Sequence, residues 1–450
     1  MSSHVDIALV NLPHRTLGTY PVGEHLGLCY LASCLRQAGY RTEIVDGCIH
    51  RMSLSGVVRE VQRMRPRVTG LSVSEPCLPQ AIVLTRHLRR AIPDLHITAG
   101  GFLPTLAGEG VFRLIPGLNS VITGEGELAI LDLMRRLGSS SLGEGIVLHG
   151  EKPALDELPP PARDTLPLHV KMGFPASLST SRGCIGTCTY CSAGSYARAS
   201  GGAPWRARSI ESVVAELESL VKEYGVRIVK IVDDNFLGPQ NGAAARVREF
   251  VNQLKALRLK ARFSLSARVD TITYDMLEEL KSVGLSFLSV GIESCVQREL
   301  DEWDKNSTIA QIRAGLRALD KSRIPYNAGF IMFGPNTTLE ELRIKVEFMM
   351  GFAPSTPAAA LNVMRPFCGT PLAFQLQDAG RLRGKPGFLS FSFSDPRVAA
   401  IHQNLKTRLL RCFRSAVITE ADRYRGSAVS RAAQRGLAEL SELVLRAGGQ

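Results

Sequence analysis

The most informative segment of the chain reads Ser181-Arg-Gly-Cys-Ile-Gly-Thr-Cys-Thr-Tyr-Cys191. It brings three cysteines, Cys184, Cys188 and Cys191, close together. Three thiolates at this spacing can ligate three irons of a cubane cluster, whereas fully ligated ferredoxin-type clusters use four cysteines. The fourth iron would then lack a protein ligand, which leaves an open coordination site for a substrate or cosubstrate.

Two other interpretations of the triad are weaker. Buried cysteines often pack as small hydrophobic side chains, but Gly183 and Gly186 leave this backbone free to wrap, and the segment has no helical or strand period. A zinc knuckle needs a fourth Cys or His nearby, and the next cysteine along the chain is Cys295. The triad therefore predicts an iron–sulfur cluster.

Length and composition are typical of an intracellular enzyme. A chain of 450 residues, 45% hydrophobic, predicts two or three domains with a large buried core. No signal pattern begins the chain and no apolar run is long enough to cross a bilayer, so we expect a cytoplasmic protein without a membrane partner. Ten cysteines without framework spacing indicate reduced thiols. The net charge of +12 comes with no aromatic–basic module, so a nucleic-acid partner is not expected.

Residues 1–150 alternate apolar strands with amphipathic helices, which predicts an α/β fold with a doubly wound, Rossmann-like parallel sheet. A Pro-rich linker is expected at 151–171, where Leu158-Pro-Pro-Pro161 and Pro167 make the chain too rigid and donor-poor for a helix or a strand. The expected strands are 5–10, 42–45, 68–73, 96–99 and 120–122, and the expected helices are 26–38, 54–64, 78–91 and 126–137.

A second alternation of strands and helices at 172–372 predicts a partial (β/α)6 TIM-type barrel. A small helical C-terminal segment is expected at 373–450, with its helical pattern at 398–445 and basic residues on one face. The expected barrel strands are 176–180, 227–232, 262–266, 287–291, 326–332 and 359–363, and the helices between them include 209–224, 274–283, 308–321 and 338–350.

Chemically reactive residues follow each expected barrel strand, at the end where barrel enzymes place their sites. In chain order these are the Cys triad, Asp233-Asp-Asn-Phe236, Arg268, Glu293-Ser294, Gly334-Pro335 and Arg365-Pro366. Six such loops on one rim indicate an enzyme.

Several further motifs resemble those of one enzyme family. They are Trp205-Arg206-Ala-Arg-Ser-Ile-Glu211, Gly291-Ile-Glu-Ser294 with Lys305, Phe367-Cys-Gly-Thr-Pro371, Pro21-Val-Gly-Glu-His-Leu-Gly-Leu28, Gly100-Gly-Phe-Leu-Pro104 and Gly124-Glu-Gly-Glu127. Together with the triad and Tyr190, they make residues 5–372 similar to the radical S-adenosylmethionine (radical SAM) superfamily, in its branch with an N-terminal cobalamin-binding-type domain.

This resemblance implies a mechanism and a cofactor set. S-adenosylmethionine (SAM) would chelate the open iron of a [4Fe-4S] cluster, and an electron from a donor such as flavodoxin or ferredoxin would cleave it to a 5′-deoxyadenosyl radical. The protein would supply orientation and exclusion of water.

The resemblance also implies SAM-binding residues. Tyr190 would lie near the adenine, Asp233 or Asn235 and Glu293 would hold ribose hydroxyls or the amino group, and Arg268 would pair with the carboxylate. An internal barrel salt bridge is the alternative for Arg268 and Glu293, and Asp234 could instead cap a turn.

The N-terminal domain decides the subclass. Ser74, Gly100 and Gly101 resemble the loops that receive the nucleotide tail of cobalamin. The Asp-x-His-x-x-Gly motif that supplies a cobalt-ligating His in many cobalamin proteins is absent, and its nearest run is Gly23-Glu-His-Leu-Gly27. We interpret His25 as a structural or surface residue rather than a cobalt ligand. The remaining N-terminal cysteines lack metal spacing and are expected to be inert: Cys29, Cys34, Cys48 and Cys77.

Two reactions are consistent with the sequence. The first is cobalamin-dependent C-methylation of a small natural-product intermediate, as in antibiotic biosynthesis, which analogy with the branch favours. The second is a cobalamin-independent radical dehydration, epimerisation or rearrangement of a small substrate such as an aminosugar. The second route needs a general acid or base, for which Glu24, His25 and Glu75 are candidates. A cluster- or cobalamin-based sensor is inconsistent with so complete a barrel rim.

Overall fold

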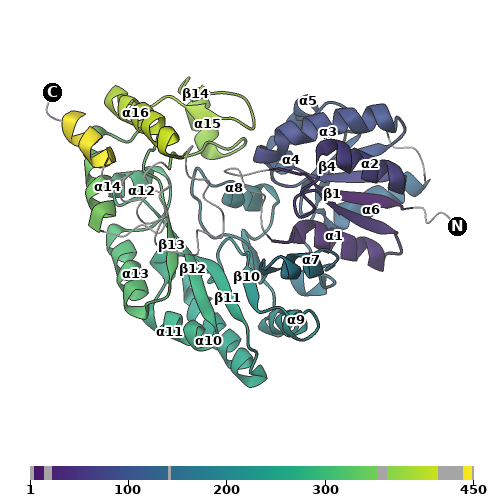
Figure 1. Cartoon of the computed structure of the whole chain (residues 1–450), viewed down its shortest axis with the longest axis horizontal. Helices are drawn as coiled ribbons and strands as arrows, with labels where there is room; N and C mark the ends of the chain where they lie inside the picture. Colours follow the sequence, from purple (N-terminus) through teal and green to yellow (C-terminus); the bar gives the residue numbers. More distant parts are fainter. Residues whose placement is uncertain (1–4, 15–22, 140–142, 352–361, 414–438, 448–450) are drawn as a thin grey trace.

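The computed structural model of the chain describes residues 5–14, 23–139, 143–351, 362–413 and 439–447. It contains two parallel sheets with helices packed on them, and a C-terminal segment that lies beside both (Figure 1). This confirms the predicted α/β class. None of the helices in the described part of the chain is both long and apolar enough to cross a membrane.

The N-terminal sheet has six parallel strands in the order β2-β1-β3-β4-β5-β6. This is a doubly wound arrangement in which the strand order reverses between β1 and β3, and ligands bind such sheets at that point, beyond the carboxyl ends of the strands. The five expected strands are present and a sixth, β6, was not predicted. The strands are β1 (Ile7–Asn11), β2 (Thr42–Asp46), β3 (Val68–Ser72), β4 (His96–Gly100), β5 (Ser120–Gly124) and β6 (Ile146–Gly150).

Helices cover both faces of this sheet. Helices α1 (Leu26–Gln37) and α6 (Gly126–Ser139) pack together on one face, where their apolar sides join the strands in one core cluster. Helices α2 (Leu54–Met64) and α3 (Leu78–Ala91) cover the other face and have the predicted limits. The short helices α4 (Phe102–Ala107) and α5 (Gly110–Leu114) follow β4.

The second sheet is parallel in the order β13-β12-β11-β10-β7, which matches a partial barrel. Its strands are β7 (Ala176–Leu178), β10 (Ile228–Ile231), β11 (Arg262–Arg268), β12 (Leu285–Glu293) and β13 (Tyr326–Phe330). The expected sixth strand at 359–363 falls mostly outside the described residues, although Val363 forms a parallel bridge with Phe333. The surrounding helices are α9 (Ile210–Lys222), α10 (Gln240–Leu257), α11 (Tyr274–Ser282), α12 (Gln297–Glu302), α13 (Ile309–Ser322) and α14 (Leu339–Gly351).

The connecting segments differ from the sequence prediction in two places. The linker was expected to be non-helical, which is wrong, because α7 (Leu166–Lys171) forms with Pro167 in its first turn, where the missing N–H of proline is tolerated. A short antiparallel ribbon, β8 (Ser181–Gly183) with β9 (Trp205–Ala207), was not predicted. Helix α8 (Ser192–Ala199) follows the Cys triad and lies between the two sheets (Figure 1).

The C-terminal segment contains α15 (Pro371–Asp378), the short pair β14 (Leu382–Arg383) and β15 (Ser390–Phe391), and α16 (Pro396–Phe413). The helical pattern expected at 398–445 is therefore helical at its beginning, and residues 439–447 are helical at its end. The remainder of that expectation, 414–438, lies outside the described residues.

Candidate functional site

The cysteine triad lies in the loop between β8 and α8. The Cys184 Sγ accepts a hydrogen bond from the Gly186 N–H at 3.4 Å, and the Cys191 Sγ accepts one from the Gly194 N–H at 3.5 Å and thereby caps α8. Burial raises the pKa of both thiols. Deprotonated sulfurs at such positions need a compensating cation, which is what bound iron supplies.

The geometry of the loop fits a cluster. A Cβ built on Gly186 would lie 3.5 Å from the Cys184 Sγ and 3.7 Å from the Cys188 Sγ, so a side chain there would intrude beside both sulfurs. No three His, Cys, Asp or Glu side chains of the described residues converge on a single ion position. That the three sulfurs each bind one iron of a cubane cluster stays a prediction.

Arg268 lies beside this loop in an internal salt bridge. Its guanidinium donates to both Asp270 carboxylate oxygens, at 3.1 and 2.7 Å, and also to the Lys305 carbonyl at 2.6 Å. A Cβ on Gly186 would lie 2.8 Å from its Nη1, so this nitrogen faces the cysteine loop. The salt-bridge alternative is thus what the structure contains for Arg268, and its pairing with a SAM carboxylate stays a prediction.

Glu293 occupies a strained position at the end of β12. Its φ is +67°, a left-handed backbone conformation that residues other than glycine adopt at a cost of about 1–2 kcal/mol. The pairing of β12 with β13 shifts register between Gly291 and Glu293, which accounts for this backbone. The Glu293 carboxylate lies 3.6 Å from the Lys305 ammonium. Strain of this kind is often found at functional sites.

Asp233 and Asn235, which follow β10, are both used internally. Asp233 accepts hydrogen bonds from the Thr180 N–H at 2.7 Å, the Thr180 hydroxyl at 2.5 Å and the Ser181 hydroxyl at 2.7 Å. Asn235 is fully buried and donates to the Gly238 carbonyl at 3.3 Å. Asp233 and Asp234 both line the cavity described below. Burial, with the neighbouring Asp233, raises the pKa of Asp234 to about 6.

Tyr190 packs its ring edge-on against Trp303, with centroids 6.2 Å apart. The adjacent Thr189 donates its N–H to the Trp303 carbonyl at 2.9 Å and accepts from the Leu372 N–H at 3.0 Å. These bonds fix the backbone of the cysteine loop between α12 and α15. A contact of Tyr190 with adenine stays a prediction.

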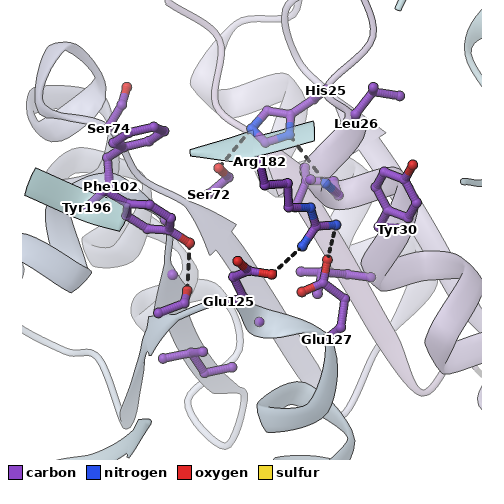
Figure 2. Close-up of a pocket in the computed structure, with 18 of the residues that line it drawn as sticks. His25, Leu26, Tyr30, Ser72, Ser74, Phe102, Glu125, Glu127, Arg182 and Tyr196 are labelled. Atoms are coloured by element: carbon purple, nitrogen blue, oxygen red, sulfur yellow. Dashed lines mark hydrogen bonds and ion pairs between the residues drawn. The ribbon is translucent and has the colours of Figure 1, made fainter. Parts of the chain in front are cut away.

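A cavity of about 570 Å³ lies between the two domains (Figure 2). Its N-terminal wall includes the three residues predicted to receive cobalamin, Ser74, Gly100 and Gly101, and its opposite wall includes Arg182, Gly183 and Asp234, next to the cysteine loop. The structure therefore brings the predicted cobalamin loops and the residues directly before the triad to one cavity.

Part of the cavity lies between the sheet and helices α1 and α6, and we call this part the slot. On the sheet side the register aligns Leu9 with Gly70 and Gly70 with Thr98, so small side chains leave room there. On the helix side it is lined by Leu28, Leu31 and Ile130. The Thr98 hydroxyl is buried and has no hydrogen-bond partner among the described residues. An unsatisfied buried hydroxyl in an open slot indicates space for a ligand.

The three candidate acid–base residues are all engaged. His25 accepts from the Leu28 N–H through Nδ1 at 3.3 Å, so its Nε2 carries the proton and donates to the Ser72 hydroxyl at 2.8 Å (Figure 2). Burial lowers the His25 pKa, which keeps the ring neutral. Glu24 pairs with Arg163 at 2.6 Å. His25 thus caps α1 and also lines the cavity, and its structural role stays a prediction.

Glu75 connects the N-terminal domain to the C-terminal segment. One carboxylate oxygen accepts from the Cys368 N–H at 2.8 Å and the other from the Gly387 N–H at 3.1 Å. Both oxygens are thus used to hold the segment that follows the barrel. Glu75 is not among the residues that line the cavity, although its neighbour Ser74 is.

The four N-terminal cysteines are buried. Burial raises the pKa of Cys29 to about 12 and that of Cys34 to about 11, which keeps these thiols protonated. Cys77 lies at the cavity wall beside the Ser74 hydroxyl, 3.1 Å from it. Chemical inertness of the group stays a prediction.

Sequence reasoning missed residues that shape this cavity. Phe102 and Tyr196, from different domains, pack with tilted rings whose centroids are 4.7 Å apart, and Arg182 lies between Glu125 and Glu127 (Figure 2). The motif Gly124-Glu-Gly-Glu127 was noted only as a family match. The available signal for an ion pair was the presence of two acidic residues in one turn, Glu125 and Glu127, and of Arg182 shortly before the first cysteine of the triad.

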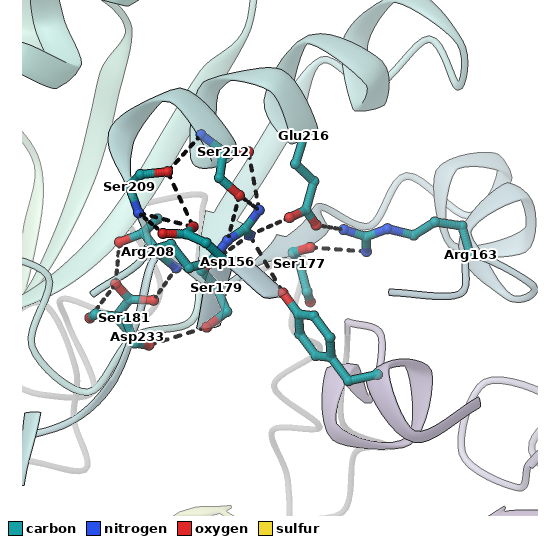
Figure 3. Close-up of polar contacts among 12 residues, drawn as sticks. Asp156, Arg163, Ser177, Ser179, Ser181, Arg208, Ser209, Ser212, Glu216 and Asp233 are labelled. Carbon is teal, nitrogen blue, oxygen red and sulfur yellow. Dashed lines mark hydrogen bonds and ion pairs between the residues drawn. The ribbon is translucent and has the colours of Figure 1, made fainter. Parts of the chain in front are cut away.

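A second buried ion-pair network joins the domains (Figure 3). Arg163 pairs with Glu24 of the N-terminal domain and with Glu216 of α9, each at 2.6 Å, and Arg208 also pairs with Glu216. Arg208 in turn donates to the Tyr30 hydroxyl of α1 at 3.5 Å. The two sheets are thus joined through paired charges.

Comparison with known proteins identifies both domains. The radical SAM superfamily matches residues 178–349, and the B12 binding domain matches residues 19–134. An uncharacterized methyltransferase of Pyrococcus horikoshii is 27% identical, covering 80% of this chain and 79% of its own length. The anaerobic magnesium-protoporphyrin IX monomethyl ester cyclase of Cereibacter sphaeroides is 24% identical, covering 78% of this chain and 60% of its own length.

Solved structures share the fold over most of this chain. The cobalamin-dependent SAM radical enzyme OxsB, with aqua-cobalamin and SAM bound, aligns with a TM-score of 0.76 at 21% identity, covering 91% of this chain and 67% of that one. The radical SAM methyltransferase TsrM from Kitasatospora setae, with cobalamin and a [4Fe-4S] cluster bound, gives 0.66 at 17% identity, covering 85% and 80%. These likenesses confirm the predicted fold.

Proposed function

Since the chain is a radical SAM enzyme with an N-terminal B12-binding domain, we propose that it methylates an unactivated carbon of a small natural-product intermediate. When bound, the [4Fe-4S] cluster with SAM supplies a 5′-deoxyadenosyl radical, and cobalamin carries the methyl group. One observation carries this proposal: a single cavity is lined by Ser74, Gly100 and Gly101 on one side and by the residues beside the cysteine loop on the other.

The slot between the sheet and α1/α6 is the proposed site of the cobalamin nucleotide tail. Gly70 and Thr98 leave it open, and the buried Thr98 hydroxyl can hydrogen-bond to a polar group of the tail. At the rim, Gly101 has φ +106°, and a Cβ there would lie 3.2 Å from the Val73 carbonyl. Glycine is therefore required at this turn, where it also lets the backbone come close to a ligand.

The proposed SAM contacts lie on the barrel side. Asp234 lines the cavity and can bind a cationic or hydroxyl group, whereas Asp233 and Asn235 hold the loop in place. Glu293, directed by its left-handed backbone and paired with Lys305, is the second proposed contact. Arg268 faces the cysteine loop and is proposed to pair with the SAM carboxylate through the nitrogen not used by Asp270.

The character of the cavity supports a small substrate. The Phe102–Tyr196 pair forms an aromatic wall, and the charges of Arg182, Glu125 and Glu127 are paired with one another. We propose an electron donor such as flavodoxin or ferredoxin as the partner that reduces the cluster. The cobalamin-independent alternative is less well supported, because the three acid–base candidates named from the sequence are held by other groups.

The proposal can be tested without knowing the substrate. Holoenzyme purified anaerobically with cobalamin is reduced and given SAM carrying an isotopic label in its methyl group, and the products are quantified by mass spectrometry. Methyl transfer predicts about one S-adenosylhomocysteine per bound cobalamin in the absence of substrate. Formation of 5′-deoxyadenosine alone, with cobalamin bound, would contradict methyl transfer and favour radical elimination or rearrangement.

A further inference from the structure

The ribbon that precedes the first cluster cysteine is held by the N-terminal domain. Cys184 directly follows β8, and β8 pairs with β9 so that Arg182 stands opposite Arg206. Both guanidinium groups reach the same carboxylate, that of Glu125 in the turn after β5. The two strands of the ribbon are therefore tied to one residue of the other domain.

Arg182 forms a fork between two carboxylates. Its Nη1 lies 2.6 Å from Glu125 and its Nη2 lies 2.7 Å from Glu127 (Figure 2). Both carboxylate side chains are nearly buried, at 6% and 5% exposure, and the guanidinium also lies 5.0 Å above the centre of the Tyr30 ring. A planar guanidinium held at two nitrogens and one face has little freedom to rotate.

The other end of the cysteine loop is tied to the same turn. Cys191 caps the start of α8, and Tyr196 on that helix donates its hydroxyl hydrogen to the Gly124 carbonyl at 2.8 Å. Strand β8 before the triad and helix α8 after it thus both attach to residues 124–127. Because the loop between them is short, fixing both ends restricts the loop itself.

The turn is itself rigid. Gly124 has φ +76°, and a Cβ there would lie 2.6 Å from the Gly150 carbonyl of the neighbouring strand β6. The pairing of β5 with β6 includes these two glycines, so the turn is fixed to the N-terminal sheet. Gly100 and Gly101 lie at the carboxyl end of β4 in the same sheet. The turn therefore links the predicted cobalamin edge to the cluster loop.

We propose that Glu125 and Glu127, acting through Arg182, are positioning residues for the iron–sulfur cluster. They hold the cysteine loop at a fixed place against the N-terminal sheet, so that cluster and SAM face the cavity in one orientation. They touch neither cofactor in this account. That the loop is thereby aligned with a bound cobalamin rests on the proposed function, whereas the positioning of the cluster does not.

The test uses three variants of the full chain. Glu127→Gln keeps the shape of the side chain and removes its charge. Arg182→Lys keeps the charge and removes the fork. Tyr196→Phe removes only the hydrogen bond to Gly124 and keeps the packing against Phe102. The control is Glu60→Gln, which breaks an ion pair with Arg63 at the protein surface.

The readouts are iron content, unfolding temperature, the EPR spectrum of the reduced cluster with and without SAM, and the rate of SAM cleavage. We expect all three variants to retain the cluster and the fold and to give a heterogeneous EPR signal with SAM. The two ion-pair variants, Glu127→Gln and Arg182→Lys, should cleave SAM about 10- to 100-fold more slowly than wild type. Tyr196→Phe should show a smaller loss, and the control should match wild type.

Two outcomes would overturn the inference. Wild-type EPR spectra and cleavage rates in Glu127→Gln and Arg182→Lys would show that the loop keeps its place without this turn. A fall in iron content that parallels a fall in unfolding temperature in all three variants would show that these residues have a merely structural role. None of these readouts needs cobalamin, so a wild-type protein without cobalamin would contradict methyl transfer while leaving this test intact.

Discussion

Substituting Gly70 by valine should remove cobalamin binding and leave the cluster unaffected. Gly70 lies on β3 in the slot between Leu9 and Thr98, and a Cβ built there is 3.0 Å from the Leu9 Cδ2 and 3.7 Å from the Thr98 Cγ2. The nearer atom is the end of a flexible side chain, so a first carbon fits after a small shift. The two further methyl groups of valine then enter the slot.

The expected energies follow from this geometry. Overpacking costs about 1–3 kcal/mol, and the preference of valine over glycine in a strand recovers up to about 1 kcal/mol. The variant should therefore lose at most about 3 kcal/mol of stability and remain folded. The nucleotide tail cannot share the slot with the new methyl groups, so the affinity for cobalamin should fall at least about 100-fold, which corresponds to about 2.8 kcal/mol.

The assay is an anaerobic titration of apoprotein with cobalamin, followed by absorbance, alongside iron content and SAM cleavage. The control is Gly138→Ala on α6, where a Cβ meets no atom within 4 Å. The Gly138→Ala variant should bind cobalamin as wild type does, and alanine at this position should add up to about 1 kcal/mol of helix stability. Cobalamin binding at wild-type affinity by Gly70→Val would refute the slot as the site of the tail.

Three further outcomes are expected. Replacing any cysteine of the triad by alanine should abolish iron binding and SAM cleavage in anaerobic reconstitution, and retained cleavage would refute the assignment of the triad. Because the Asp234 pKa is about 6, SAM affinity measured by calorimetry should weaken as pH falls below that value, and Asp234→Asn should remove this dependence; an unchanged pH profile would exclude Asp234 as a contact. Burial raises the pKa of Glu24, so the folded state loses stability as the pH rises through that pKa and the carboxyl group ionises. This loss of stability is larger when the partner of Glu24, Arg163, is removed. Urea unfolding should show Arg163→Met destabilised by about 3–5 kcal/mol at neutral pH, less in acid and less when combined with Glu24→Gln; equal losses at both pH values would contradict this.

Local sequence signals predicted most of the fold. Helices α2 and α3 begin and end at the predicted residues because an apolar stripe and, for α2, the capping hydroxyl of Ser53 mark them. Strand β6 was missed because it is a partly exposed edge strand with a weak apolar pattern. Helix α7 was missed because Pro167 was interpreted as a helix breaker, although it occupies the first turn.

The site was predictable only where chemistry is encoded by close spacing. The cysteine triad is such a case, because one loop carries all three proposed ligands. Asp233 and Asp234 line the cavity whereas Asn235 is buried, and a run of polar residues does not specify which of its members face a cavity. The pairing of Arg182 with Glu125 joins residues 57 positions apart in two domains, and no local pattern specifies such a contact.

Cobalamin content tests the central claim most directly. The protein is purified anaerobically from cells supplied with the vitamin, and cobalamin is quantified by absorbance and mass spectrometry beside iron and sulfide. The account predicts near-stoichiometric cobalamin together with one [4Fe-4S] cluster, and loss of the cobalamin alone in Gly70→Val. An intact cluster that cleaves SAM in a protein that binds no cobalamin would contradict it and leave the N-terminal domain as a scaffold.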